Sequence, residues 1–86
     1  MDKKTLETAI RISGRSYRNE EILKNATKCG CYCCCAIFSP SEIKEWADFS
    51  PRTAICPYCG TDSVLDADAF TPFTERNLRK IRELMF

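Results

Sequence analysis

Cysteine is the residue type of this 86-residue chain whose number and spacing point to chemistry, with seven copies. Two of them stand in the segment ICPYCG, residues 55–60, where two residues separate Cys56 from Cys59. Proline after the first cysteine and glycine after the second are typical of a zinc knuckle. In such a turn, backbone N–H groups point towards the sulfurs, and the glycine adopts positive φ at little steric cost. One knuckle supplies half of a tetrahedral metal site, so we expect a second pair elsewhere in the chain.

The second pair must come from the other five cysteines, which lie within residues 29–35. Only Cys31 and Cys34 among them show the same three-residue offset. The full pattern is C-x2-C-x21-C-x2-C, and its central gap is just longer than the roughly 15–20 residues usual for such zinc sites. An element inserted between the knuckles accounts for the extra length. The spacing therefore predicts one structural Zn²⁺ ion held by four thiolates, Cys31, Cys34, Cys56 and Cys59.

Three further cysteines, Cys29, Cys33 and Cys35, remain outside this pattern. We interpret them as small apolar residues of a strand and of the first knuckle. Cys33 lies between two ligands, near enough to exchange onto the metal or to oxidise. Cys35 occupies the position at which glycine eases the second knuckle, so we expect local strain there.

Other cysteine chemistries compete with the zinc site. Disulfides or unconnected buried thiols leave the matched spacing unexplained, and seven is an odd number for a disulfide framework. CPYC is also the active-site sequence of glutaredoxins, but the 27 residues after Cys59 are too few for the rest of that fold. Paired CPxCG knuckles hold iron in rubredoxins, which are usually shorter, acidic and without flanking helices. Zinc is the favoured metal, and thiol redox chemistry and iron binding are the alternatives.

Composition limits the classes of function. The chain carries 13 Lys and Arg against 12 Asp and Glu, a net charge of +1 that favours no particular partner. It has no histidine, which excludes Cys-His catalytic pairs and mixed Cys/His zinc sites. No apolar run approaches the roughly 18 residues needed to span a membrane, and the N-terminal sequence lacks the apolar segment of a secretory signal. We therefore expect a cytoplasmic protein, and in such a reducing compartment clustered thiols are more often metal ligands than disulfides.

The chain divides into three parts that we expect to form one domain, residues 1–86. A helical N-terminal arm covers residues 1–28, a zinc-ribbon core covers 29–68 and a C-terminal helix covers 74–86. A chain of this length buries only about 60–65% of its unfolded surface, so a stabilising metal is expected. The predicted fold class is a small α+β metal-stabilised domain: a zinc ribbon of two knuckles with short β-hairpins, an inserted helix and flanking N- and C-terminal helices.

Helical periodicity supports the N-terminal arm and the C-terminal helix. Apolar residues recur at helical spacing from Leu6 until Gly14, and Asn19 is a good N-cap for a short second helix. The C-terminal helix carries its apolar residues on one stripe, which we expect to pack onto the ribbon. These residues are Leu78, Ile81 and Met85.

The core contains one helix signature and two strand signatures. Ser39 and Glu42, three residues apart, form a capping box with proline at the first helical position, which predicts an inserted helix over residues 40–49. The short apolar segments RTAI and SVLD flank the second knuckle and predict two strands.

The motifs together resemble a family of small, largely uncharacterised bacterial cytoplasmic proteins with a zinc-ribbon-like centre. The matching segments are KCGCYCC, IFSPSEIKEWADF, TAICPYCGTDSVL and FTERNLRKIRELMF, within about residues 28–86. The resemblance implies a Cys-aromatic-aromatic-Cys first knuckle, a Ser-Pro helix containing Trp and a CPYCG second knuckle, and it places the ligands on the same four cysteines. The chain departs from the pattern at Cys33, where the second aromatic usually stands, and at Cys35. The family supplies no established activity.

Two functions compete at this level. In the first, zinc holds the knuckles and the helices present a surface to a protein partner, as an interaction or regulatory module, with LRKIRELMF as the contact. In the second, the chain is a nucleic-acid-binding zinc ribbon, although its near-neutral charge argues against this. The basic residues available are Arg76, Arg79, Lys80 and Arg82, with Arg11, Arg15 and Arg18.

An enzyme is not expected. Four protein ligands leave zinc no open position for water or substrate. Asp62, Asp66 and Asp68 have neither a histidine nor an obvious nucleophile to work with, and we expect them to be turn and capping residues in a solvated loop. The sequence indicates no catalytic residue, no small-molecule substrate and no membrane partner.

Overall fold

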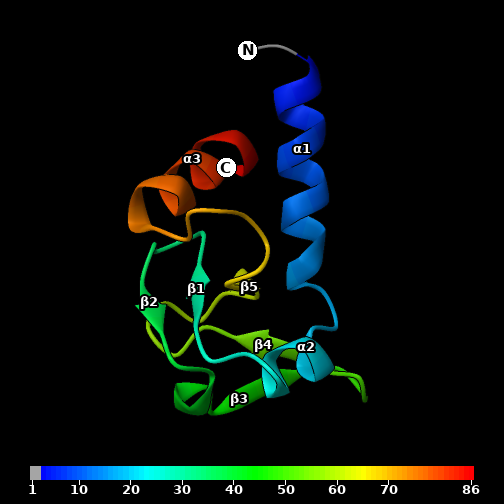
Figure 1. Cartoon of the computed structure of the whole chain (residues 1–86). Helices are drawn as coiled ribbons and strands as arrows, with labels where there is room; N and C mark the ends of the chain where they lie inside the picture. Colours follow the sequence, from blue (N-terminus) through cyan, green and yellow to red (C-terminus); the bar gives the residue numbers. More distant parts are fainter. Residues whose placement is uncertain (1–2) are drawn as a thin grey trace.

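The computed structural model describes residues 3–86 and shows three α-helices and two small antiparallel sheets (Figure 1). Met1 and Asp2 of the predicted arm lie outside the described residues. The helices are α1 (Lys3–Ser13), α2 (Glu20–Lys24) and α3 (Glu75–Met85), with short 3-10 helices η1 (Gly14–Ser16) and η2 (Pro40–Glu42). The strands are β1 (Cys29–Cys31), β2 (Ile37–Phe38), β3 (Glu45–Ala47), β4 (Thr53–Ile55) and β5 (Val64–Asp66). The predicted small α+β class is confirmed. Within residues 3–86, no helix combines the length and the apolar composition that crossing a membrane requires.

The first sheet has β1 at its centre, with β2 and β5 antiparallel on either side. Gly30 pairs with Ile37 of β2 and with Leu65 of β5. The first knuckle is the turn from β1 to β2, so the hairpin positions Cys31 at the end of its first strand. Every residue of β1 and β5 is buried, as expected for strands that are covered on both faces.

The second sheet pairs β3 with β4, with Trp46 opposite Ala54. The predicted helix over residues 40–49 is therefore wrong, since β3 lies inside that range. A helix of ten residues is marginal in water. Pairing with β4 instead provides backbone hydrogen-bond partners for both strands and places the aromatic Trp46 in a conformation that aromatic residues favour.

The predicted capping box itself is present. The Ser39 side chain accepts a hydrogen bond from the Ser41 N–H at 3.3 Å, and Glu42 Oε2 accepts one from the Ser39 N–H at 3.0 Å. The helix that it starts ends after one 3-10 turn, because Ile43 is already extended, with φ −73° and ψ 121°. The capping box thus starts the short helix η2, and the pairing of β3 with β4 prevents the helix from continuing.

The first sheet separates two apolar clusters. Neighbouring residues of a strand point to opposite faces, and Val64 and Leu65 of β5 accordingly belong to different clusters. The first cluster contains Leu23, Cys29, Cys31, Phe38, Ile43, Ala54, Cys56 and Val64. The second contains Ala9, Tyr32, Cys35, Leu65, Leu78 and Ile81. Two of the predicted ligands therefore belong to the core.

Gly30 lets α3 approach the first sheet closely. A β-carbon at this position would lie 2.9 Å from Leu78 Cδ1, and 3.1 Å from both the Ala36 carbonyl oxygen and Phe73 Cε2. These distances are shorter than van der Waals contact, so only glycine fits without displacing α3 or the hairpin.

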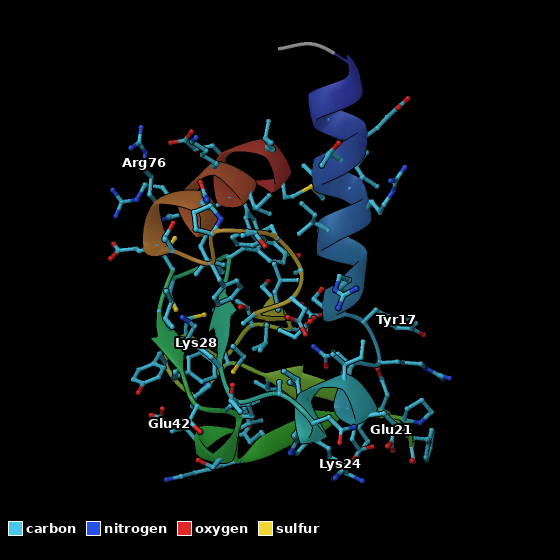
Figure 2. The ribbon with its side chains drawn as sticks, viewed as in Figure 1. Tyr17, Glu21, Lys24, Lys28, Glu42 and Arg76 are labelled. Carbon is cyan, nitrogen blue, oxygen red and sulfur yellow. The ribbon has the colours of Figure 1, made fainter. Side chains whose placement is uncertain are left out.

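The predicted terminal helices are confirmed. α1 packs against α3, beside it in Figure 1, and the α3 stripe faces the second cluster, with Leu78 and Ile81 buried. Thr74 caps α3 by accepting a hydrogen bond from the Asn77 N–H at 3.2 Å. Charged side chains such as Lys24 and Arg76 point away from the ribbon (Figure 2). The helices therefore cover the sheets with one face each and expose the other.

Candidate metal centre

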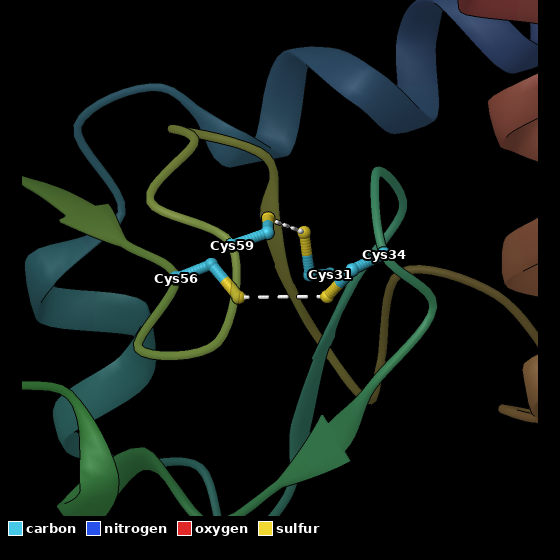
Figure 3. Close-up of side chains that lie close together, drawn as sticks. All are labelled: Cys31, Cys34, Cys56 and Cys59. Atoms are coloured by element: carbon cyan, nitrogen blue, oxygen red, sulfur yellow. Dashed lines mark hydrogen bonds between the residues drawn. The ribbon is translucent and has the colours of Figure 1, made fainter.

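The four cysteines selected by spacing lie together in the folded chain (Figure 3). Their Sγ atoms all lie within 4.8 Å of one another. Cys31 and Cys59 have their sulfurs 3.6 Å apart, and Cys34 and Cys56 have theirs 3.7 Å apart. No disulfide joins them. Each close pair contains one thiol from each knuckle, so the sulfurs form a single group between the two turns.

The two knuckles share one backbone conformation although their sequences differ. The Cys35 N–H donates to the Cys31 carbonyl at 2.8 Å, and the Gly60 N–H donates to the Cys56 carbonyl at 3.0 Å. Both donors have positive φ, 66° at Cys35 and 78° at Gly60. This conformation costs a residue with a β-carbon about 1–2 kcal/mol. The strain predicted at Cys35 is thus present, and burial of its side chain in the second cluster offsets it.

Backbone amides point at the sulfurs, as predicted for zinc knuckles. The Cys33 N–H donates to Cys31 Sγ at 3.3 Å, and the Tyr58 N–H donates to Cys56 Sγ at 3.4 Å. Hydrogen bonds of this kind favour the ionised sulfur. Each turn therefore gives its first cysteine a backbone hydrogen bond that favours the thiolate.

The two cross-knuckle sulfur separations match those of a tetrahedral zinc–thiolate centre. Zn–S bonds of about 2.3 Å place the sulfurs about 3.8 Å apart at the corners of a tetrahedron. The two cross-knuckle distances, 3.6 and 3.7 Å, are close to that value. A set of four thiols is a soft donor set that suits zinc or iron and does not suit magnesium or calcium. The residues present therefore fit the predicted ion.

Burial and hydrogen bonding shift the four thiol pKa values in different directions. Burial raises the pKa of Cys31 to about 11, and it also raises the pKa values of Cys34 and Cys56. Burial acts in the same direction on Cys59, but hydrogen bonds from Thr61 and from neighbouring thiols outweigh it and lower the pKa of Cys59 to about 6. Adjacent, desolvated thiolates oppose one another's ionisation. A divalent cation between the sulfurs would supply the compensating charge.

Thr61 is a residue of the site that the cysteine spacing did not reveal. Its Oγ1 lies 3.1 Å from Cys59 Sγ and 3.5 Å from Cys31 Sγ. Its carbonyl accepts the Cys56 N–H at 2.8 Å. Thr61 therefore contacts three of the four candidate ligands. The sequence feature that could have indicated it is a hydroxyl side chain two residues after a knuckle cysteine, since threonine hydroxyls often bond to nearby groups.

The first knuckle connects two strands of the first sheet, whereas the second connects β4 of the second sheet to β5 of the first, so the site depends on how the two sheets are held together. Asn19 is fully buried, and its Nδ2 donates to the Val64 carbonyl of β5 at 2.8 Å. Its Oδ1 accepts the Ala54 N–H of β4 at 3.1 Å. The prediction that the Asn19 side chain caps α2 is wrong, because this side chain makes no capping bond. It bridges instead the two strands that flank the second knuckle.

An ion pair beside Asn19 strengthens this connection. The Arg52 N–H donates to Glu20 Oε1 at 2.9 Å, and Arg52 Nε and Nη2 donate to Glu20 Oε2 at 2.9 and 2.6 Å. These hydrogen bonds from Arg52 hold the pKa of Glu20 below its ordinary value. The guanidinium also lies 5.4 Å from the centre of the Trp46 ring, within cation–π range. The pair ties α2 to the start of β4.

A second buried carboxylate, Asp66, holds the N-terminal segment. Arg15 donates to Asp66 from Nε at 3.1 Å and from Nη2 at 2.7 Å. The expectation that Asp66 lies in a solvated loop is wrong, because it ends β5 and is buried. Asp62 and Asp68 are exposed, as expected. The three cysteines outside the pattern also differ: Cys29 and Cys35 are buried, Cys33 is half-buried, and none of them joins the metal-ligand group found within residues 3–86.

Comparison of the chain with protein-family models, curated proteins and solved structures gave no match. The fold and the site by themselves define a small α+β protein with a cluster of four cysteines that could hold a metal ion. The resemblance to bacterial zinc-ribbon-like proteins stays a prediction from the sequence motifs.

Proposed function

We propose that this chain is a small zinc-binding protein whose four-cysteine site is structural. The observation that carries the proposal is the convergence of two turns that are distant in the sequence, with all four sulfurs within 4.8 Å of one another. Zinc bound there would join the β1–β2 turn to the loop between β4 and β5. Structural zinc contributes about 10–16 kcal/mol of apparent binding free energy in small zinc domains, comparable to the whole stability of a typical domain.

A structural role is favoured over a catalytic one by the number of ligands. Four thiolates complete the coordination of zinc and leave no position for water or a substrate. The chain also has no histidine to serve as a base. All seven cysteines are free thiols, and a reducing compartment such as the cytoplasm would keep the ligands available. We therefore propose a cytoplasmic metal-stabilised scaffold without enzymatic activity.

Metal analysis of the purified protein tests the site. We expect one zinc ion per chain. Cys31→Ser and Cys56→Ser remove buried ligands and should abolish both stoichiometric zinc binding and cooperative unfolding. Cys29→Ser is the matched control, because Cys29 is equally buried, lies outside the group and donates to the Phe38 carbonyl at 3.5 Å, a bond that serine can also make. A folded wild-type protein without metal would refute the proposal, and bound iron would correct the choice of metal.

We further propose that the zinc-stabilised chain is a protein-interaction module. A groove of about 520 Å³ runs between α1 and α3. Apolar residues on its walls include Ile12, Phe70 and Leu84, and the oppositely charged Lys80 and Glu83 also line it. An apolar groove between two helices, with charges of both signs, suits an amphipathic helix of a partner protein.

Affinity purification of tagged variants tests the groove. Leu84→Asp should lose the protein retained by the wild type, because it places a charge among the apolar side chains that line the groove. Leu6→Asp is the matched control, since Leu6 is an exposed apolar residue of α1 outside the groove. Both variants should keep one zinc ion. Equal retention by the two variants would contradict the assignment of the groove.

Nucleic-acid binding, the alternative from the sequence, is less favoured. Arg15 pairs with Asp66 and Arg79 pairs with Glu75, each at 2.7 Å, which reduces the positive charge available for phosphates. The net charge of +1 points the same way. Retention on DNA or RNA that weakens as salt rises would revive this alternative.

A further inference from the structure

The two close thiol pairs of the site each join a surface cysteine to a buried one. Cys31 is 0% exposed and Cys56 is 2% exposed, whereas Cys34 and Cys59 are exposed. The pairs are Cys31 with Cys59 at 3.6 Å and Cys34 with Cys56 at 3.7 Å, and each spans the two knuckles (Figure 3). An oxidant from solvent therefore meets one accessible thiol in each pair, with a second thiol directly behind it.

We propose that the metal centre is also a modification site for peroxides, at which oxidation forms the disulfides Cys31–Cys59 and Cys34–Cys56 and releases the metal. This inference rests on the proposed zinc site. It differs from a simple loss of metal because it specifies which cysteines pair, and both disulfides join one knuckle to the other.

The chemistry proceeds in two balanced steps for each pair. The exposed thiolate, such as Cys59, attacks one oxygen of the peroxide; an S–O bond forms, the O–O bond breaks and hydroxide leaves. The sulfur of Cys31 then attacks the sulfenic sulfur of Cys59; an S–S bond forms, the S–O bond breaks and a second hydroxide leaves. The two sulfurs give up two electrons, and one peroxide is reduced. Disulfide sulfurs carry no negative charge, so the oxidised site no longer holds a divalent cation.

Contacts outside the sulfurs also hold the knuckles beside each other, because β1, which leads into the first knuckle, pairs with β5, which follows the second. Asn19 bridges β4 and β5, and Glu20 with Arg52 ties α2 to β4. Closing a disulfide shortens the Cys31–Cys59 sulfur separation from 3.6 Å to about 2.05 Å. This movement is small enough for side-chain rotation and slight closure of the turns. Oxidation would thus replace one cross-link between the knuckles by another.

The remaining thiols are poorly placed to compete. Cys29 is 0% exposed and Cys35 is 7% exposed, so solvent oxidants reach neither readily. Cys33 is half-buried, and its side chain packs against the first cluster. Cys33 is therefore the competitor that the experiment must exclude.

Peroxide titration of the zinc-loaded, reduced full chain tests the inference. A chelating dye should record one equivalent of released zinc. Trypsin then separates residues 29–44, with five cysteines, from residues 53–76, with the other two. Under non-reducing conditions we expect these two peptides to be disulfide-linked, and fragmentation should show Cys31 bonded to Cys59 and Cys34 bonded to Cys56. Cys33→Ser should give the same linkage and the same zinc release.

Several outcomes would overturn the inference. Disulfides confined within either peptide would show that each knuckle oxidises by itself, and a linkage through Cys33 would name a different reactive thiol. Zinc retained after oxidation of the exposed thiols would exclude coupled release. Zinc content is measured first in the reduced protein, so a folded protein without zinc refutes the proposed function, whereas a different disulfide linkage in the zinc-loaded protein refutes only this inference.

Discussion

Asn19 is the residue outside the cysteine cluster on which the geometry of the site depends most directly. It is fully buried, and its amide satisfies the Val64 carbonyl and the Ala54 N–H on two different sheets. In the variant Asn19→Ala, both backbone groups lose this partner in a place that water does not reach. Each buried group left without a partner costs about 1–3 kcal/mol. We therefore expect the variant to lose about 2–6 kcal/mol of unfolding free energy, a large part of the stability of a small domain.

Urea unfolding of the zinc-saturated protein, followed by circular dichroism, measures this loss. The matched control is Asn25→Ala, because Asn25 is exposed and its side chain donates only to the Glu21 carbonyl at 3.1 Å. Substitutions of this kind usually change stability by less than about 0.5 kcal/mol. If Asn19→Ala and Asn25→Ala unfold at the same urea concentration, the bridging role of Asn19 is refuted.

A second substitution separates hydrogen bonding from the loss of volume. Asn19→Asp keeps the size of the side chain and the acceptor for Ala54, but it places a carboxylate oxygen against the Val64 carbonyl oxygen. The protonated acid can donate there and the carboxylate cannot, so burial and this contact should raise the pKa of the new acid. Relative to the wild type, the variant should therefore be most stable below the unfolded pKa of aspartate and lose stability as the pH rises. A stability difference that does not change with pH would contradict this account.

Three further predictions follow from contacts elsewhere in the fold. Gly30→Ala should cost about 1–3 kcal/mol by overpacking against α3, whereas Gly14→Ala, with nothing within 4 Å of the added carbon, should be near neutral in the same urea assay. Asp66→Asn should cost about 1.5–3 kcal/mol, because it replaces the buried carboxylate that accepts both bonds from Arg15. Hydrogen bonds from Arg52 lower the pKa of Glu20 below 4.5. The Glu20 carboxylate therefore stabilises the folded state above that pH, and this stabilisation is lost as the pH falls. The Glu20→Gln variant should be less stable than the wild type at neutral pH, and the difference in unfolding free energy should shrink on acidification.

The cysteine pairs could be selected from the sequence because a knuckle is a local structure. The three-residue offset of Cys31 and Cys34 and of Cys56 and Cys59 is determined by the turn itself, and the sulfurs of both turns lie in one group. The positive φ of Gly60 was predictable for the same reason. The terminal helices, with apolar periodicity over several turns, were likewise predictable from local pattern.

Residues whose partners are distant in the sequence were misread. The capping box at Ser39 predicted a helix, but the segment that follows pairs with β4 and becomes β3. Asn19 is of a residue type that favours N-caps, yet its side chain bonds to backbone groups of residues 35 and 45 positions away. Asp66 is of a residue type common in loops, yet it is buried and accepts a hydrogen bond from Arg15, 51 positions away. In each case the local preference is worth about 1 kcal/mol, and hydrogen bonds to residues distant in the sequence outweigh it.

The chemical character of the protein, four thiols in two matched turns that suit a soft metal ion, can thus be predicted from the amino-acid sequence. The folded chain is needed to show which thiols face each other, which of them solvent reaches and which contacts hold the two turns together. The two kinds of property differ in how far apart along the chain the residues that decide them lie. Turn geometry and thiol chemistry depend on neighbours within a few residues, whereas sulfur pairing and exposure depend on two sheets that meet through Asn19 and on the burial of Cys31 and Cys56.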